Sequence, residues 1–465
     1  MGDKEKLHIA MFPWLAYGHV MPFFQVAKFF AEKGHHVYFI STPKIIHRLP
    51  QSDSNLSSHL RFFQLPLPPV QGLPEGVESP AELPIQKDQY LKKAYDMLQL
   101  PLINFLKDNS QVTWIIQDFV SYWLPSAAAQ LGVYSVYFSI VNATTCSFFG
   151  SAADLINGRF QKAEDLTMVP QWINYNSNIK FKLYEIMRGH QECKDSVPDL
   201  YRYGMVLKDC RAVIVRSCPE FEPEAFSIFG KLLEKPVLPV SLLPPSLQDY
   251  TVADGKWQVL KDWLDSKKDK SVVYVALGTL LTLSQELMHE LAYGLEKSGL
   301  PFIWVINKRP LVEGKTGSDL VPVGFEDRIS GRGLIWTDWA PQIKILAHAS
   351  VGGFLTHSGW SSVIESLGFG LPLIMLTGGS DTGLVARLMH MRVGLEIERD
   401  ERDGAFTSDS VAESIRRVIK EKEGHALRAN AWAMREIFGN LELRSKYLEE
   451  MVRFIEKDPA PTRSV

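Results

Sequence analysis

Residues 339–382 read WAPQIKILAHASVGGFLTHSGWSSVIESLGFGLPLIMLTGGSDT. Within this stretch, HSGWSS followed by VIESLGFG predicts a turn that leads from a strand into a helix. Gly359 in the turn lets the backbone approach a ligand closely. The free N–H groups and the dipole of the new helix then favour an anion. The stretch therefore predicts an α/β fold with an anion-binding turn.

The side chains around this turn are suited to bind a nucleoside diphosphate. His357 lies just before the turn and can donate to a phosphate, and Ser361 and Ser362 can cap the helix or donate as well. Glu365, one turn into the helix, suits a ribose with two hydroxyls, and Trp339 offers a face for a uracil ring. Each residue alone has a structural alternative: a core tryptophan, a capping serine or a solvated glutamate. Their combination at this spacing favours a uridine nucleotide site.

The Trp-Ala-Pro-Gln opening, the His-Ser-Gly-Trp core and the glutamate five residues later resemble the donor signature of plant family 1 UDP-sugar glycosyltransferases. The resemblance implies a GT-B fold, in which two Rossmann-like domains with parallel sheets face each other across an interdomain cleft. It implies that Trp339 stacks on uracil. It places Ala340 and Gln342 at the uracil edge, His357, Gly359, Ser361 and Ser362 at the diphosphate, Glu365 at the ribose, Trp360, Asp381 and Thr382 at the sugar, and Thr279 at the phosphates.

Three residues depart from the usual pattern of that family. Ser358 stands where cysteine is usual, Ser361 where asparagine is usual, and Thr382 where glucose-using members usually carry glutamine. A glutamine amide can hold two sugar hydroxyls, whereas threonine reaches one. The loss would cost about 1–3 kcal/mol for a glucose donor if the hydroxyls stayed unpaired. The donor sugar is therefore open between glucose, rhamnose, xylose and others.

Sugar transfer to a hydroxyl needs a base, and His19 is the candidate. It follows the first apolar strand, at the carboxyl end where open α/β sheets bind ligands. Gly18 before it permits a tight turn and is counted with the donor-binding positions. Asp118, at the end of TWIIQD, can orient the imidazole. The alternatives are a solvated loop histidine and an aspartate that caps a helix. The resemblance assigns both residues to catalysis, with inversion at the anomeric carbon.

The bulk composition is that of an ordinary globular protein. The chain has 465 residues, 46% apolar and 22% charged, which favours two or three domains. The net charge of −3 gives no electrostatic indication of nucleic-acid binding. Four scattered cysteines, no signal-like start and no apolar run of membrane length indicate a cytoplasmic protein without a membrane span. No Asp-x-Asp metal signature appears, so we expect no metal and no cofactor beyond the UDP-sugar co-substrate.

Two successive α/β patterns divide the chain. We expect an acceptor-binding Rossmann-like domain over 1–242, a linker over 243–256, and a UDP-sugar-binding domain over 257–440. The last segment, 441–465, reads as a helix that packs back on the first domain. Thr282 and Gln285 resemble a capping box, and the charge run at 398–403 reads as a solvated loop.

The acceptor is less well defined. Three stretches, PWLAYGH, VRSCPEFEPE and SVGGFLTHSGW, resemble the plant branch that adds a sugar to flavonoid, terpenoid or steroidal glycosides. Asn142 and Thr144 follow a strand end and are candidate acceptor contacts, and we expect a monomer. Two alternatives are an enzyme that acts on an aglycone and a UDP-sugar-binding homologue with weak catalysis. A nicotinamide oxidoreductase is disfavoured because no GxGxxG follows either leading strand.

Overall fold

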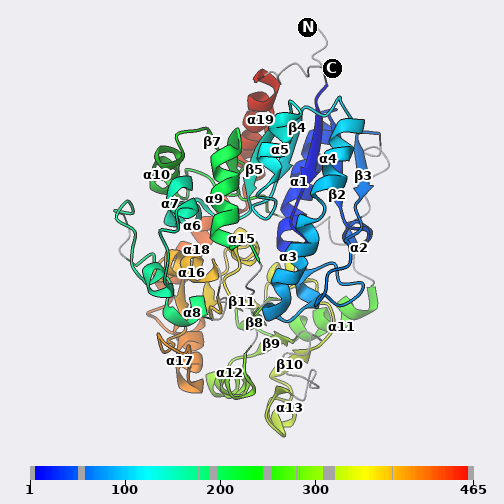
Figure 1. Cartoon of the computed structure of the whole chain (residues 1–465). Coiled ribbons are helices and arrows are strands. Elements are labelled where there is room, and N and C mark those ends of the chain that lie inside the picture. Colours follow the sequence, from blue (N-terminus) through cyan, green and yellow to red (C-terminus); the bar gives the residue numbers. More distant parts are fainter. Residues whose placement is uncertain are drawn as a thin grey trace.

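The computed structural model describes residues 6–50, 58–175, 178–187, 196–244, 254–278, 281, 283–306, 320–379 and 381–458. Two sheets, each entirely parallel, occupy the two halves of the molecule, and Figure 1 shows them one above the other. This arrangement confirms the predicted fold of two Rossmann-like α/β domains. No helix in the described ranges is long and apolar enough to cross a membrane.

The first sheet has the order β3-β2-β1-β4-β5-β6-β7. Its strands are β1 His8–Phe12, β2 His36–Ser41, β3 Leu60–Gln64, β4 Trp114–Gln117, β5 Tyr134–Ser139, β6 Ala212–Val215 and β7 Val237–Pro239. Its helices are α1 Tyr17–Glu32, α2 Pro43–Arg48, α3 Asp88–Asp96, α4 Gln99–Asp108, α5 Leu124–Gln130, α6 Ala143–Phe148, α7 Ala152–Ile156, α8 Leu183–Met187, α9 Asp199–Asp209 and α10 Pro223–Leu233, with short 3₁₀ turns at Pro80–Glu82, Ile85–Lys87 and Ala163–Thr167.

The second sheet has the order β10-β9-β8-β11-β12-β13. Its strands are β8 Val272–Ala276, β9 Phe302–Val305, β10 Gly333–Trp336, β11 Val351–Thr356, β12 Leu373–Met375 and β13 Gly394–Glu396. Its helices are α11 Asp254–Asp265, α12 Gln285–Ser298, α13 Phe325–Arg328, α14 Gln342–Leu346, α15 Trp360–Gly368, α16 Thr382–Met389, α17 Ser408–Ile419 and α18 His425–Phe438, followed by α19 Leu441–Lys457.

In both sheets the strand order reverses at one place, between β1 and β4 in the first sheet and between β8 and β11 in the second. Apolar runs such as IAMF and VVYVA form these central strands because both of their faces are buried. The loops at the carboxyl ends of such a pair diverge to opposite sides, which opens a crevice for ligands. The fold thus marks two loop pairs as ligand sites.

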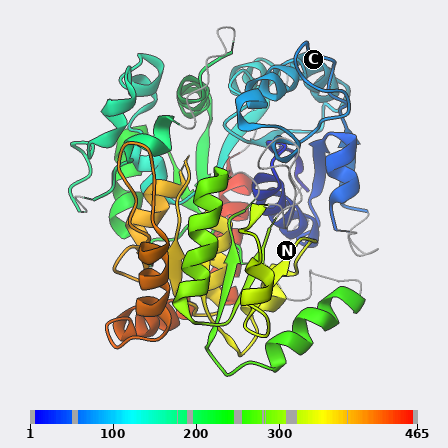
Figure 2. The same ribbon diagram turned by 90° about the horizontal axis from the view of Figure 1, so that it is seen from below.

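Close packing fixes the helices of the second half. Figure 2 shows α12, in green, beside α17, in orange, and the two helices touch. A Cβ at Gly294 would come within 2.5 Å of Val411, so glycine permits this approach. Helix α12 is capped by Ser284, whose side chain accepts from the Leu287 N–H, and not by the predicted Thr282, which lies outside the described residues. The helix therefore begins later than predicted.

The chain returns to the first half at its carboxyl end. The predicted last helix corresponds to α19, because the backbone leaves α18 at Gly439 and α19 starts afresh with Asn440 as its cap. Helix α19 buries Leu448, Met451 and Ile455 in the core of the first sheet, and Figure 1 shows it beside that sheet. Most of the predicted linker lies outside the described residues, and α11 begins inside its last positions.

Candidate active site

His19 and Asp118 meet at the reversal point of the first sheet. His19 lies in the first turn of α1, which follows β1, and Asp118 comes directly after β4. The His19 Nδ1 atom is 2.7 Å from Asp118 Oδ2. Asp118 is 1% exposed, and its carboxylate also accepts from the backbone N–H groups of Trp14 at 3.2 Å and Phe119 at 2.8 Å. The carboxylate is therefore held by the main chain of both loops.

These contacts assign the proton on the imidazole. A carboxylate can only accept hydrogen bonds, so His19 Nδ1 donates and Nε2 is the nitrogen able to accept a proton. The side chain of His19 is 19% exposed, which makes it neither fully solvated nor part of the core. Asp118 is not a helix cap, since the next helix, α5, begins at Leu124 with Trp123 as its cap residue. The two structural alternatives for this pair are therefore wrong.

The interpretation of Gly18 as a turn residue is also wrong. Gly18 lies inside α1, whose cap residue is Ala16, and its φ is not in the left-handed region. A Cβ added at Gly18 would meet nothing within 4 Å, so the space beside it is open.

The turn between β11 and α15 is built around the ring of His357. A Cβ at Gly278 would lie 2.4 Å from the ring and one at Gly359 2.6 Å from it, so glycine on both sides makes room for the imidazole. Ser358, which lies between His357 and Gly359 in the sequence, has a left-handed φ of 71°, and this is uncommon for a residue with a side chain. Desolvation lowers the pKa of His357 to about 4, so the ring is neutral at pH 7. Its buried Nδ1 lacks a hydrogen-bond partner among the described residues.

Three polar side chains of the predicted donor site do come together on α14 and α15. The amide of Gln342 donates to Glu365 Oε2 at 2.6 Å and to Ser362 Oγ at 3.3 Å. Desolvation raises the pKa of Glu365 to about 7, while the Gln342 hydrogen bond and the charge of Arg216 oppose this rise. Trp339, in the loop before α14, is 62% exposed, and Ala340 packs partly buried beside it.

The two halves of the site approach each other. Desolvation and the nearby Glu365 carboxylate raise the pKa of Tyr17, which is two residues from His19. The charge of Glu365, on α15, therefore acts on Tyr17 in the first turn of α1, which also contains His19.

Arg216 is a member of this site that the sequence reasoning missed. It follows β6, is 3% exposed, and donates to Ser361 Oγ at 2.6 Å. It also donates to the carbonyls of Leu242 at 3.0 Å and Leu243 at 3.3 Å. Arg216 and Ser361 both stand in stretches that the sequence singled out, but no local pattern connects residues 145 positions apart. The arginine ties the first half of the chain to the start of α15.

The structure corrects the predicted sugar contact of Trp360 and shows internal contacts at Thr382 and Asp381. Trp360 is 3% exposed, stacks on Phe221 and donates its indole N–H to the Arg216 carbonyl at 2.7 Å, so its ring faces the core. Thr382 is 8% exposed and donates its hydroxyl to the Gly379 carbonyl at 2.6 Å. Asp381 is the cap residue of α16. Thr279 lies outside the described residues.

The two predicted acceptor contacts lie in the interior of the first domain. Asn142 and Thr144 are fully buried. The carboxylate of Glu222 accepts from the Asn142 amide at 2.9 Å and from the Thr144 backbone N–H at 2.9 Å. Tyr175 donates to the Thr144 hydroxyl at 3.2 Å. The hydrogen bonds of both side chains therefore hold the start of α6 in place inside the first domain.

Comparison with known proteins identifies the family. Residues 249–434 match the family model described as UDP-glucoronosyl and UDP-glucosyl transferase. The chain is 46% identical to UDP-glycosyltransferase 91C1 of Arabidopsis thaliana, over 100% of both chains. The chain belongs to the UDP-glycosyltransferase family. It is 37% identical to the soyasaponin III rhamnosyltransferase of Glycine max, with 99% of this chain and 98% of that one covered.

A solved structure shows the same architecture. The structure of UGT73P12 from Glycyrrhiza uralensis, complexed with glycyrrhetinic acid 3-O-monoglucuronide, superposes with a TM-score of 0.80 at 23% identity, covering 97% of this chain and 96% of that one. The GT-B fold and the enzyme class predicted from residues 339–382 are thus confirmed. This glycosyltransferase transfers a sugar from a UDP-sugar.

Proposed function

We propose that this glycosyltransferase transfers the sugar, with inversion, to a hydroxyl of a small plant glycoside, with His19 as the base. The contact of 2.7 Å between His19 Nδ1 and Asp118 Oδ2 carries the proposal, because it leaves Nε2 to take a proton. The acceptor oxygen loses its proton to Nε2 and attacks the anomeric carbon. The bond from that carbon to the UDP oxygen breaks, and UDP leaves with the bonding pair. Asp118 stabilises the imidazolium that forms.

The donor turn supplies the second requirement, which is to stabilise the leaving diphosphate. The N-terminal N–H groups of α15 can face an anion, and the neutral His357 ring carries one N–H to donate. Ser361 and Ser362 add hydroxyl groups beside them. Trp339 offers an exposed ring face for the uracil, and Glu365 accepts two hydrogen bonds from the ribose.

A relative supports the glycoside acceptor. The name of the soyasaponin III rhamnosyltransferase states that it acts on a saponin, and saponins are glycosides. Transfer should be measured with UDP-glucose, UDP-rhamnose, UDP-xylose and UDP-galactose against paired glycosides and aglycones, with the mass shift as the readout. Product from glycosides alone supports the proposal. Product from aglycones alone overturns the acceptor class, and tight UDP binding without any product indicates a homologue with weak catalysis.

The pKa of Glu365 predicts how UDP affinity depends on pH. In the free protein this carboxyl takes up a proton as the pH falls through about 7, whereas the ribose hydroxyls require the carboxylate. Affinity should therefore reach a plateau above pH 7 and weaken by up to about tenfold per pH unit below it. The terminal phosphate of UDP also titrates near this range, so Glu365→Gln is the matched control in calorimetry. A pH profile that is identical in the two proteins would contradict this prediction.

The hydroxyl of Thr382 predicts an unusual donor choice. Because this hydroxyl donates to the Gly379 carbonyl, it has no proton left for a sugar. We propose that the natural donor sugar does not need two hydrogen bonds from the side chain of residue 382. This sugar is rhamnose or xylose rather than glucose. Thr382→Gln should shift the ratio of kcat/KM values towards UDP-glucose by about tenfold, the equivalent of one added hydrogen bond.

The control for that variant is Thr382→Val, which keeps the shape and removes the hydroxyl. It should lower the melting temperature through the lost turn contact but leave the donor ranking unchanged. A changed ranking in Thr382→Val would show that the hydroxyl itself reads the sugar.

A further inference from the structure

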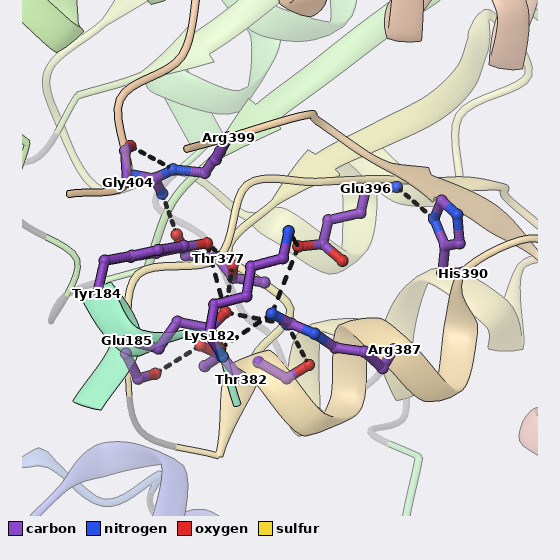
Figure 3. A network of polar contacts seen from close by, with 12 residues as sticks. Lys182, Tyr184, Glu185, Thr377, Thr382, Arg387, His390, Glu396, Arg399 and Gly404 are labelled. Carbon is purple, nitrogen blue, oxygen red and sulfur yellow. Dashed lines mark hydrogen bonds and ion pairs between the residues drawn. The ribbon is translucent and has the colours of Figure 1, made fainter. Parts of the chain in front are cut away.

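A buried carboxylate from the first half of the chain lies inside the second half. Glu185, on α8, is 1% exposed. Its Oε1 accepts from Thr377 Oγ1 at 2.7 Å and Arg387 Nη1 at 2.9 Å, and its Oε2 accepts from Arg387 Nη2 at 3.0 Å and the Lys182 backbone N–H at 2.9 Å. Figure 3 shows Glu185 at the centre of this network, between α8 and α16. Both carboxylate oxygens are satisfied by fixed donors.

The donors flank the segment that we assign to the sugar. Thr377 comes just before the glycines of TGGSDT, and Arg387 lies on α16, which starts at Thr382. A Cβ at Gly383 would lie 2.4 Å from Glu185 Oε2, and one at Gly379 would lie 3.2 Å from the Glu185 carbonyl. Gly379 and Gly383 therefore leave room for α8.

A second tier of contacts holds α8 in place. The Tyr184 hydroxyl lies 2.7 Å from Thr377 Oγ1, and the guanidinium of Arg399 stacks over the Tyr184 ring at 4.6 Å. Arg399 also donates to the Gly404 carbonyl at 2.7 Å and is 4% exposed. The prediction of a solvated loop at 398–403 is therefore wrong for Arg399, because the Arg399 side chain is buried and packs on Tyr184 of this network.

We propose that Glu185 is a positioning residue that sets the sugar-reading start of α16, so that the acceptor half of the chain helps to choose the donor sugar. The inference rests on the proposed function, in which the start of α16 lies beside the donor sugar. Glu185 acts through Thr377 and Arg387, which hold the two ends of that segment. The described uracil, ribose and diphosphate positions lie on α14, α15 and the loops before them, and the hydrogen bonds of Glu185 given above do not reach these positions.

Three variants test the proposal. Glu185→Gln keeps the shape but turns an amide N–H₂ towards donors, and Thr377→Val removes one donor and leaves the Arg387 pair intact. Lys182→Met is the control for the neighbouring ion pair, because it removes the contact of 2.8 Å with Glu396, which also lies 3.7 Å from Arg387 Nη2, and leaves the hydrogen bonds of Glu185 and Thr377 in place. The melting temperature of each variant is measured first.

For Glu185→Gln we expect KM for the preferred UDP-sugar to rise by about tenfold and the donor ranking to change, with the affinity for UDP alone unchanged by calorimetry. For Thr377→Val we expect a rise in KM of about threefold, with the same changes in donor ranking and UDP affinity as in Glu185→Gln. For Lys182→Met we expect the wild-type KM and donor ranking. Unchanged KM and ranking in folded Glu185→Gln and Thr377→Val would overturn the inference. So would an equal effect in Lys182→Met, or a loss of UDP affinity. Failure of the proposed function is distinct, since the wild type itself would then give product from aglycones alone or no product at all.

Discussion

Replacement of His19 by alanine should abolish sugar transfer while UDP still binds. The imidazole is the group placed to remove the acceptor proton, and a positioned general base contributes about 10²–10⁴-fold to a rate. We therefore expect kcat to fall by about 10³-fold or more. The uracil, ribose and diphosphate positions lie on the second half of the chain, so calorimetry should return the wild-type affinity for UDP.

His47→Ala is the control for this variant, because His47 is exposed in the last turn of α2, within the same domain. Its kcat should equal that of the wild type. A His19→Ala protein that keeps most of its kcat would remove His19 from the role of base, whatever its UDP affinity.

Much of the site follows from positions along the sequence. His19 and Asp118 each come after an apolar strand, and parallel strands bring their carboxyl ends to one edge of a sheet. The nucleotide positions lie close together along the chain, from the loop before α14 through β11 to α15, and Gln342, Ser362 and Glu365 meet within this short stretch. These features are predictable because the geometry is local or is dictated by the order of the strands.

Contacts between distant segments could not be predicted in this way. Arg216 reaches Ser361, and Glu185 reaches Arg387, across 145 and 202 positions respectively. Trp360 and Thr382 both match the family pattern in sequence. The Trp360 indole nevertheless donates to the Arg216 carbonyl, 144 positions away, and the Thr382 hydroxyl donates to the Gly379 carbonyl in the turn before α16. A motif gives the type of residue at a position, and the surrounding packing decides where its side chain lies.

Asp118→Asn should be almost as damaging as the loss of His19, for a different reason. The carboxylate accepts at both oxygens, from His19 and Trp14 on one side and from Phe119 on the other. An asparagine has one acceptor oxygen, so its N–H₂ group must face a donor in either orientation. It also lacks the charge that stabilises the imidazolium. We expect kcat to fall by about 10²–10⁴-fold, and the free energy of unfolding to drop by about 1–3 kcal/mol for the unpaired buried N–H group.

A double variant separates orientation from any direct role of Asp118 in the chemistry. Because Asp118 acts through His19, the combination of His19→Ala and Asp118→Asn should transfer sugar no more slowly than His19→Ala alone. Independent roles would instead make the two losses multiply. The residual rate of the double variant, measured at saturating UDP-sugar together with its melting temperature, decides between these outcomes. A multiplied loss in a protein that still melts near the single variants would show that Asp118 contacts the reacting groups itself.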